Sequence, residues 1–390
     1  MHILMISLDA DLLSRRIGNA IERHEHYAEL LGGRISMAIC NRRGVTPLGE
    51  YRSARLIAQA TDSRGYAGYL LDGYRLGLRL HAEQPVDAIA SQDPFLTALI
   101  GLMLRRRLRV PLIVQDHSSF LGSPYFTRER RRNALLKLMA RLTMPRADAV
   151  RVVNRRERLA CIRLGIPADR VCVIPVGIDL APFAAPAPPE QLAAWRARLE
   201  IGPETPLVLW VGRPVAFKNL PLLLLAFKQV RAILPAAHLA LVGDMDGTNV
   251  PGQIAAHGLQ DVVRLPGPVP HAELPALYQT ATIYALSSDY EGLGRVLMEA
   301  GAAGLAVAST HTHGAADVIV PNLTGLLTPI GDAEALAEAM LRLLRNPARR
   351  RTIGEKAQAH VLTAFDHEVL AGRWAGMLHH VARREPPCES

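Results

Sequence analysis

Residues 287–304, with the sequence SSDYEGLGRVLMEAGAAG, place acids, glycines and a cation where an apolar segment gives way to a helical pattern. Glu291 and Glu299 lie on either side of Gly292 and Gly294, which leave the backbone open at the start of the predicted helix. Exposed N–H groups and the dipole of a helix favour an anion at such a position. We therefore predict a phosphate site here, with Glu291 accepting hydrogen bonds from nearby hydroxyls and Glu299 reaching a second polyol such as ribose. Ordinary helix-surface charge is the alternative interpretation of the two acids.

A second stretch, LWVGRPVAFKNLPLLLLAF at residues 209–227, carries two cations on one loop. Arg213 ends a predicted strand, and Lys218 opens the next helix. Guanidinium and ammonium groups bind phosphate oxygens through charge-assisted hydrogen bonds, so a diphosphate could lie between the two side chains. A pair of surface cations is the alternative, and it loses weight when this loop is combined with residues 287–304.

Histidines follow two of the predicted strands. His117 comes directly after PLIVQD, which makes it a candidate for the site, and a structural or merely exposed histidine is the alternative. His311 and His313 lie two residues apart in THTHGAAD without a third ligand. We therefore expect loop residues there and no metal site.

Short apolar runs alternate with helical segments in both halves of the chain. Such alternation predicts parallel sheets with helices on both faces, and open parallel sheets bind ligands at the carboxyl ends of their strands. We expect an α/β chain with two doubly wound Rossmann-like domains facing a central cleft. The predicted domains are residues 1–182, with a C-terminal helix at 367–384 packing back onto them, and residues 199–366. The proline- and alanine-rich segment 183–198 is the predicted linker.

The composition is that of a soluble globular protein, with 49% hydrophobic and 21% charged residues. No apolar run approaches the roughly 20 residues that cross a bilayer, and the N-terminus reads as a first strand rather than a signal peptide. We expect a cytoplasmic protein. The four cysteines, at positions 40, 161, 172 and 388, have no metal-type spacing, so we predict free thiols rather than a zinc site or a disulfide framework.

The positive charge is concentrated in one block. The net charge is +9, and between residues 105 and 158 alone 15 Lys and Arg residues face four acids, a local balance of +11. Within this block, TRERRRNALLKLMARLTM has apolar residues at helical spacing, interleaved with Arg131, Arg132, Lys137 and Arg141. A helix with a basic face suits anionic lipid headgroups or phosphorylated acceptors, and a solvated surface helix is the alternative. Nucleic acid is not an expected partner, because no RNA- or DNA-binding motif accompanies the charge.

Two motifs in the C-terminal half resemble those of one enzyme family. EGLGRVLMEA is similar to the E-x7-E signature of retaining glycosyltransferases of family 4, which have the GT-B fold, and VGRPVAFKN is similar to their diphosphate loop. VIPVGID, VRLPGPVPHAELPALYQTA and PNLTGLLTPIGDAEALAEAM extend the resemblance, which covers the N-terminal half only thinly. The single glycine in SRRIGNAIERH and the sequence THTHGAAD depart from the family pattern, which leaves the acceptor and the fine donor selectivity open.

The resemblance implies roles for individual residues. Arg213 and Lys218 would bind the donor diphosphate, and Glu299 would bind the ribose hydroxyls. Glu291 and His117 are the implied catalytic residues, both close to the transferred sugar. The other implied donor contacts come from Gly292, Leu293, Gly294, Arg295 and Val296 near the sugar and β-phosphate, from Val269 at the base, and from Gly18 in the first strand–helix loop.

The implied reaction moves a hexose-like unit, with retention of configuration, from a nucleotide diphosphate sugar to a glycan or lipid-linked acceptor. UDP or GDP would be the nucleotide, and exopolysaccharide or envelope glycan synthesis the context. No tightly bound cofactor or metal is implied, and the basic helix suggests a peripheral position on the inner face of the plasma membrane. Two alternatives keep the same donor site: a non-catalytic sugar-nucleotide-binding protein at the membrane surface, and a GT-B-like sugar-nucleotide epimerase.

Overall fold

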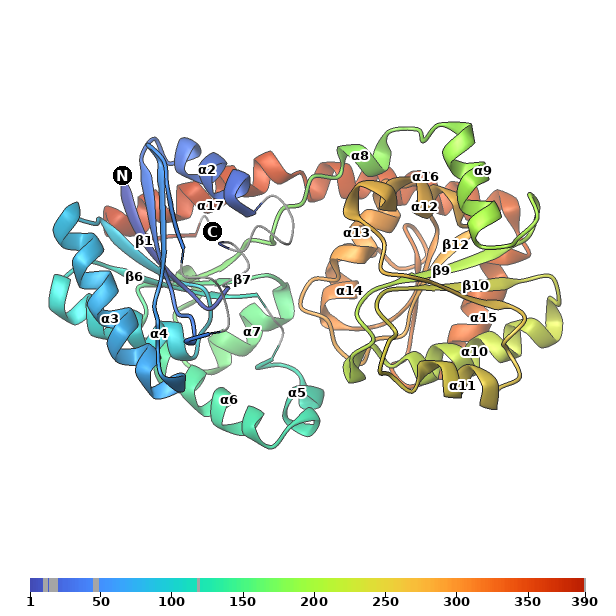
Figure 1. Cartoon of the computed structure of the whole chain (residues 1–390), viewed down its shortest axis with the longest axis horizontal. Helices are drawn as coiled ribbons and strands as arrows, with labels where there is room; N and C mark the ends of the chain where they lie inside the picture. Colours follow the sequence, from blue (N-terminus) through green and yellow to red (C-terminus); the bar gives the residue numbers. More distant parts are fainter. Residues whose placement is uncertain (10–12, 14–19, 45–48, 118–119, 389–390) are drawn as a thin grey trace. The chain divides into compact units, whose positions relative to one another are not determined.

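The computed structural model describes residues 1–9, 13, 20–44, 49–117 and 120–388 of the chain. Two compact units form, the first from Met1–Val176 with Glu368–Ser390 and the second from Gly177–His367. Each unit has helices around a largely parallel sheet (Figure 1). The prediction of two doubly wound α/β domains is confirmed. Among the described residues, no helix is both long enough and apolar enough to cross a membrane.

The first unit is built on an eight-stranded sheet with the order β3-β4-β2-β1-β5-β6-β7-β8. Neighbouring strands are parallel except for the antiparallel pair β3 and β4. Along β1, Ile3 and Met5 belong to one buried cluster while Leu4 and Ile6 belong to another, because successive side chains of a strand point to opposite faces. The strands are β1 (His2–Ser7), β2 (Arg34–Ile39), β3 (Glu50–Arg52), β4 (Leu56–Ala60), β5 (Ala88–Ser91), β6 (Leu112–Asp116), β7 (Ala149–Val152) and β8 (Val171–Val173).

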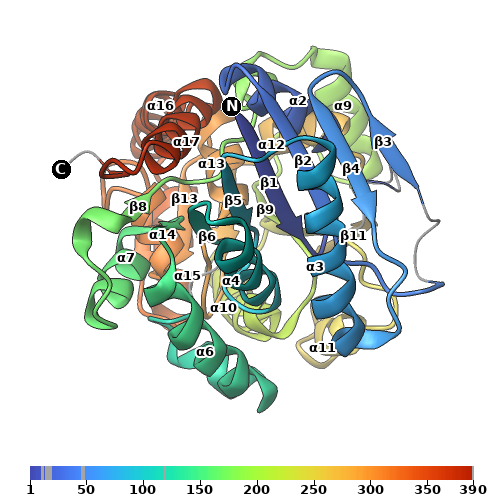
Figure 2. The same cartoon turned by 90° about the vertical axis from the view of Figure 1, so that its left-hand side faces the viewer.

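Helices cover both faces of this sheet (Figure 2). Leu76 and Leu104, from two consecutive helices, belong to the cluster on one face. On the other face, Trp374 and Leu378 come from the last helix of the chain, which returns to the first unit after the second is complete. The helices of the first unit are α2 (Ala20–Leu30), α3 (Gly65–Glu83), α4 (Leu96–Leu108), α5 (Pro124–Glu129), α6 (Arg132–Thr143), α7 (Arg155–Arg163) and α17 (His367–Ala382).

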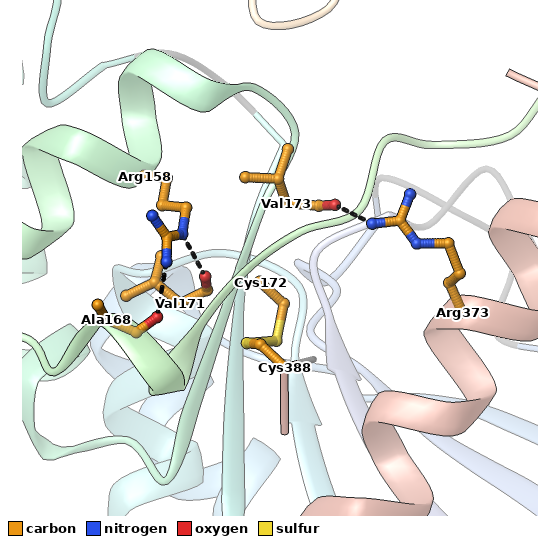
Figure 3. Close-up of a disulfide and its surroundings, with 7 residues drawn as sticks. All are labelled: Arg158, Ala168, Val171, Cys172, Val173, Arg373 and Cys388. Atoms are coloured by element: carbon orange, nitrogen blue, oxygen red, sulfur yellow. Dashed lines mark hydrogen bonds between the residues drawn. A yellow bond between two sulfur atoms is a disulfide. The ribbon is translucent and has the colours of Figure 1, made fainter. Parts of the chain in front are cut away.

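A disulfide joins Cys172 in β8 to Cys388, six residues after the end of α17 (Figure 3). The prediction of four free thiols is therefore wrong for this pair, whereas Cys40 and Cys161 are free and buried. The two bonded cysteines are 216 residues apart in the sequence, and only the return of α17 to the first unit brings their Cα atoms to 5.4 Å. Cysteine spacing along the chain carries no signal of that proximity.

The second unit has a six-stranded, fully parallel sheet with the order β11-β10-β9-β12-β13-β14. Helix α10 packs against α15, and α13 packs against α16. The strands are β9 (Leu207–Val211), β10 (His238–Val242), β11 (Val263–Gly267), β12 (Ile283–Leu286), β13 (Val307–Thr310) and β14 (Leu326–Thr328). The helices are α8 (Ala181–Ala184), α9 (Pro189–Arg198), α10 (Leu220–Ile233), α11 (Val250–Ala256), α12 (Leu274–Thr280), α13 (Arg295–Ala302), α14 (His313–Val318), α15 (Ala333–Leu344) and α16 (Pro347–Ala364).

Residues 183–198, predicted as a linker, are instead an ordered part of the second unit. Pro189 starts helix α9, a position that proline favours because its missing N–H would be unpaired there anyway. Helix α9 packs against α12 and buries Trp195. The side chain of Gln279 in α12 donates to the carbonyl oxygens of Phe183 (3.0 Å) and Ala185 (2.7 Å) and so fixes the segment that precedes α9. The prolines therefore mark element boundaries within the second unit and not a linker between the two units.

The contact between α16 and the turn after α13 can be tested with one methyl group. A Cβ at Gly354 of α16 would overlap the carbonyl oxygen of Gly304 in that turn. We expect Gly354→Ala to lower the free energy of unfolding in urea by about 1–3 kcal/mol, the usual cost of overpacking. Gly372→Ala in α17 is the matched control, because nothing lies within 4 Å of its Cβ position, and alanine there should stabilise by up to about 1 kcal/mol. Equal effects of the two changes would contradict the tight approach of α16.

Candidate functional site

Two loops at the carboxyl edge of the second sheet are bonded to each other. One follows β9 and the other follows β12, its neighbour in the sheet. Ser287 donates its hydroxyl to the carbonyl oxygen of Lys218 at 2.8 Å, and the amide of Asp289 donates to the carbonyl of Phe217 at 2.8 Å. The amide side chain of Asn219 donates to the Asp289 carboxylate at 2.9 Å. Hydrogen bonds therefore hold the two loops together as one arrangement.

Lys218 and Glu291 form a nearly buried ion pair across these loops. The Nζ–Oε1 distance is 2.5 Å, and the side chains are only 13% and 10% exposed. The hydroxyl of Ser288 donates to the same Oε1 at 2.7 Å. Water screens such a pair little, so the ammonium and the carboxylate hold each other in place.

The N-terminus of α13 begins directly beside this ion pair. Gly294, with φ +75°, precedes the helix and offers no side-chain cap to its first N–H groups. Helix α14 supports the loop from behind, because the amide of Gly314 donates to the Glu291 carbonyl at 3.2 Å. A Cβ at Gly314 would lie 2.7–2.8 Å from the backbone of Leu293, so only glycine permits this approach. The arrangement leaves helix N–H groups available for an anion.

Glu299, in α13, lies in the interior of the second unit. Its side chain is buried and accepts a hydrogen bond of 2.9 Å from the hydroxyl of Tyr278. Burial, together with the negative charge of Glu299, raises the pKa of the Tyr278 hydroxyl well above its usual value, so the phenol remains a donor. Burial and the charges of Glu299 and Glu291 likewise raise the pKa of Tyr284. Both glutamates thus lie close enough to act on the same phenol.

The other residues of the second unit that are predicted to contact the donor lie near the same edge of the sheet. Arg213 follows β9 and is exposed, and within the described residues its side chain joins no ion pair or hydrogen bond. Arg295 is exposed in the first turn of α13, and Val269 is half-exposed just after β11. The structure therefore places the predicted cations, acids, glycines and Val269 at the carboxyl ends of strands or on α13. Their contacts with a donor stay predictions.

His117 belongs to the first unit, directly after β6 and thus at the carboxyl edge of that sheet. Its Nε2 lies 3.0 Å from Oε1 of Gln92, which follows the neighbouring strand β5. Part of the ring is open to solvent, yet surrounding protein atoms and the charges of Arg151 and Arg23 lower the pKa of the imidazole well below its usual value. His117 is therefore neutral at physiological pH. Gly18 lies outside the described residues.

Three residues that contact the predicted site residues or their loop were not predicted from the sequence. Ser288 stands in the stretch that drew attention to the site, but a serine between an apolar strand and a loop has no distinguishing pattern. Tyr278 lies on α12, and only the fold brings it to Glu299. In the sequence, Gly314 is part of THTHGAAD, which departs from the family motif, and nothing there indicates its close contact with Leu293. In the described part of the chain, no group of three or more His, Cys, Asp or Glu residues is arranged to hold a metal ion.

Comparison with known proteins decides the family. Residues 193–360 match the family described as glycosyl transferases group 1, and residues 17–182 match the one described as Glycosyltransferase Family 4. A D-inositol 3-phosphate glycosyltransferase of Kineococcus radiotolerans is 30% identical over 307 residues, which are 71% of this chain and 68% of that protein. The chain belongs to glycosyltransferase family 4. The resemblance seen in the two motifs is thereby confirmed.

Other relatives of this family 4 glycosyltransferase match over different lengths. A GDP-mannose-dependent monoacylated alpha-(1-6)-phosphatidylinositol monomannoside mannosyltransferase of Corynebacterium glutamicum is 31% identical over 212 residues. That match covers 53% of this chain and 55% of the relative, so it spans about half of each protein. Among solved structures, sucrose-phosphate synthase from Thermosynechococcus elongatus superimposes with a TM-score of 0.82 at 23% identity, covering 97% of this chain and 98% of that one. The likeness shows that the glycosyltransferase has the GT-B fold.

The exposed Arg213 provides a direct test of the donor site. We expect Arg213→Ala to weaken the binding of nucleoside diphosphates by about 1.5–3 kcal/mol, the usual worth of a charge-assisted hydrogen bond, and to leave nucleoside binding unchanged. Isothermal titration calorimetry with UDP, GDP and their nucleosides measures both. Lys228→Ala is the matched control, because Lys228 is an exposed cation of α10 that takes no part in the cluster. Equal diphosphate affinity in wild type and Arg213→Ala would remove this loop from the site.

Proposed function

We propose that this chain transfers a hexose-type unit from a nucleotide diphosphate sugar, carried by UDP or GDP, to a glycan or lipid-linked acceptor with retention of configuration. The observation that carries the proposal is the Lys218–Glu291 ion pair beside the uncapped N-terminus of α13. A cation and free helix N–H groups suit a diphosphate, and the carboxylate next to them suits the anomeric carbon. Family membership supports the same donor chemistry.

Departure of the nucleotide is the step that these residues would assist. Negative charge builds up on the diphosphate as the bond to the sugar breaks, and groups fixed in advance stabilise that charge without reorganising. Lys218 is oriented by Glu291 before any donor arrives, and its two remaining N–H groups can still reach phosphate oxygens. The exposed guanidinium of Arg213 adds a second, planar pair of donors.

Glu291 and His117 would act on the sugar side of the reaction. A carboxylate beside the anomeric carbon supports retention either by forming a glycosyl ester, which the acceptor then displaces, or by stabilising an oxocarbenium-like state while the acceptor attacks on the leaving-group face. The neutral imidazole of His117 can donate or accept one hydrogen bond toward a sugar hydroxyl. Glu299, held by Tyr278, would take the ribose.

An amphipathic surface on α6 supports a lipid-linked acceptor. The exposed leucines Leu135, Leu138 and Leu142, with exposed fractions of 61%, 52% and 50%, recur at helical spacing. The opposite side of the helix buries Ala140 and Thr143 against its own unit. An apolar stripe flanked by cations suits the surface of an anionic membrane. We place the enzyme accordingly on the cytoplasmic face of the plasma membrane, in exopolysaccharide or envelope glycan synthesis, and one relative's name specifies a phosphatidylinositol mannoside acceptor.

Hydrolysis of the donor in the absence of acceptor tests the reaction. We expect slow release of nucleoside diphosphate from one member of a panel of UDP-, GDP- and ADP-sugars. Glu291→Gln should lower this release about 10²-fold or more while donor affinity changes far less, because its carboxylate acts at the transition state. Glu338→Gln on the exposed side of α15 is the control and should keep full activity. Binding without release from any donor would instead indicate a non-catalytic sugar-nucleotide-binding protein.

Sedimentation with vesicles tests the membrane surface. We expect binding to vesicles that contain phosphatidylglycerol but not to phosphatidylcholine vesicles, and a steep fall in binding with salt, because surface charges are screened. Reversal to glutamate of the four cations of this surface, Arg131, Arg132, Lys137 and Arg141, should abolish binding and leave donor hydrolysis intact. Reversal of the exposed Arg75 and Arg79 of α3 is the matched control and should have little effect. Efficient glycosylation of a soluble sugar by an enzyme that ignores anionic vesicles would contradict this part of the proposal.

A further inference from the structure

A pocket of about 640 Å³ opens at the amino edge of the first sheet, opposite the edge that carries His117. Its floor and near wall come from the end of α4, from Pro111 just before β6 and from Asp148 just before β7. The turn before β8 and the segment that follows α17 complete the wall. The five arginines that line it are Arg105, Arg106, Arg109, Arg170 and Arg384.

Of the three acids around this pocket, one is paired with an arginine and another lies beside a histidine. The guanidinium of Arg105 donates two hydrogen bonds of 2.7 Å to Asp148, which also accepts one of 2.8 Å from the amide of Leu112. Burial opposes ionisation of Asp148, but these donors outweigh it and hold the pKa of the carboxyl below its usual value. Glu385 lies 3.2 Å from the imidazole of His380. An imidazole offsets the charge of a carboxylate only when it is protonated, so Glu385 and Asp169 both count as acids of the pocket.

Four arginines therefore face two acids, Asp169 and Glu385, in the pocket. Within the part of the chain that the structure describes, the side chains of Arg106, Arg109, Arg170 and Arg384 make no ion pair and no hydrogen bond. Basic residues in the last turn of α4 complement the negative end of that helix. Arg170 belongs to the short turn before β8, and its charge adds to that of Arg105 in holding the pKa of Asp148 down. The pocket thus keeps a surplus of positive charge.

The backbone conformation of two of these arginines is unusual. Arg109 and Arg384 have φ values of +59° and +61°, in the left-handed region where glycine or asparagine is favoured at the end of a helix. They are two of the five non-glycine residues with positive φ in the described residues. An arginine at such a position costs free energy that a glycine would not, and this indicates a use for the guanidinium groups.

The wall that carries Arg384 is fastened to the rest of the unit by the disulfide. Pocket residues 384–387 end at Cys388, which is bonded to Cys172 of β8 (Figure 3). Arg158 of α7 holds the opposite turn, because it donates to the carbonyl oxygens of Ala168 (3.1 Å) and Val171 (3.0 Å) on either side of Arg170 (Figure 3). The same strand therefore anchors both cationic walls.

We propose that this pocket binds a phosphate group of a small anionic ligand, and that full affinity requires the Cys172–Cys388 disulfide. Guanidinium groups pair with phosphate oxygens through two parallel hydrogen bonds, and several arginines around one cavity suit a phosphate monoester or diphosphate. A dithiol reductant opens the disulfide by transferring two electrons and two protons to the sulfurs, which become two thiols while the reductant becomes a cyclic disulfide. Residues 384–388 then lose their covalent tie to β8. The site is independent of the donor site in the second unit.

Pyrophosphate binding by the 390-residue chain tests the site. Arg213→Ala/Lys218→Ala serves as the background, so that the donor loop does not contribute. We expect saturable binding by calorimetry. Arg109→Gly and Arg384→Gly should each weaken it about tenfold, the effect of losing one charge-assisted hydrogen bond. Glycine suits the left-handed backbone at both positions, so these variants should stay folded. Arg107→Ala, an exposed cation of α4 outside the pocket, is the control and should bind normally.

The same pyrophosphate titration tests whether binding requires the disulfide. Dithiothreitol should weaken pyrophosphate binding several-fold, Cys388→Ser should do so without reductant, and reductant should then have no further effect. Competition by glycerol 3-phosphate would identify a small phosphorylated metabolite, and selective competition by monomeric dihexanoyl phosphatidate would identify a lipid headgroup; both results support the site. Absence of pyrophosphate binding in the background variant, or unchanged binding by the two glycine variants, overturns the proposal. Donor hydrolysis by the glycine variants, made in the wild-type background, should be normal in either case, which separates this test from that of the proposed function.

Discussion

The nearly buried ion pair between Lys218 and Glu291 requires the second unit to hold both side chains in place. Charges removed from water lose hydration, and the loss is offset only when the partners are well placed and further hydrogen bonds are made. Ser288 supplies such a bond to the same carboxylate oxygen. Both loops must also keep their positions, and the adjacent parallel strands β9 and β12 ensure this because their carboxyl ends bring the two loops together. The chemistry of the site thus depends on the strand order of the sheet.

Close approach of backbone to backbone fixes the same loops from the other side. Gly314 brings the start of α14 against Leu293, and Gly354 brings α16 against the turn after α13. Helix α13 is therefore held at both of its ends, which matters because it carries Glu299 and directs its first N–H groups toward the ion pair. A glycine with no side chain to offer contributes here through the contact it permits. Three charged groups and one helix end can then keep one geometry in the absence of a ligand.

Local sequence pattern predicted most of the strands, though not β3 and β4, and the edge of the sheet where the candidate site lies, because alternation of apolar runs and amphipathic segments depends on near neighbours. The loop cations Arg213 and Lys218 and the acids Glu291 and Glu299 could be found in the same way. The first three stand in loops that follow recognisable strands, and Glu299 stands in the helix that comes next. Tyr278 beneath Glu299 and the disulfide from Cys172 could not, because both depend on contacts between segments far apart in the chain. The linker prediction for the proline-rich segment 183–198 was wrong for a different reason. Proline can end one element or begin another, and only the packing of α9 against α12 shows that a helix of the second unit begins here.

The buried guanidinium of Arg151 contacts the segment by which the chain leaves the first unit, and its charge also affects the pKa of the predicted site residue His117. Arg151 donates to the carbonyl oxygens of Ile174 and Pro175, where the chain leaves the unit, and to Oε1 of Gln115. The same Gln115 oxygen accepts from the indole of Trp374 in α17, where the chain has returned. Burial lowers the pKa of Arg151 to about 10, which still leaves it charged at neutral pH. Its charge also helps to keep His117 neutral. Burial of the ring is the main reason that the pKa of His117 is low, and the residue that joins the outgoing and returning segments adds to that effect.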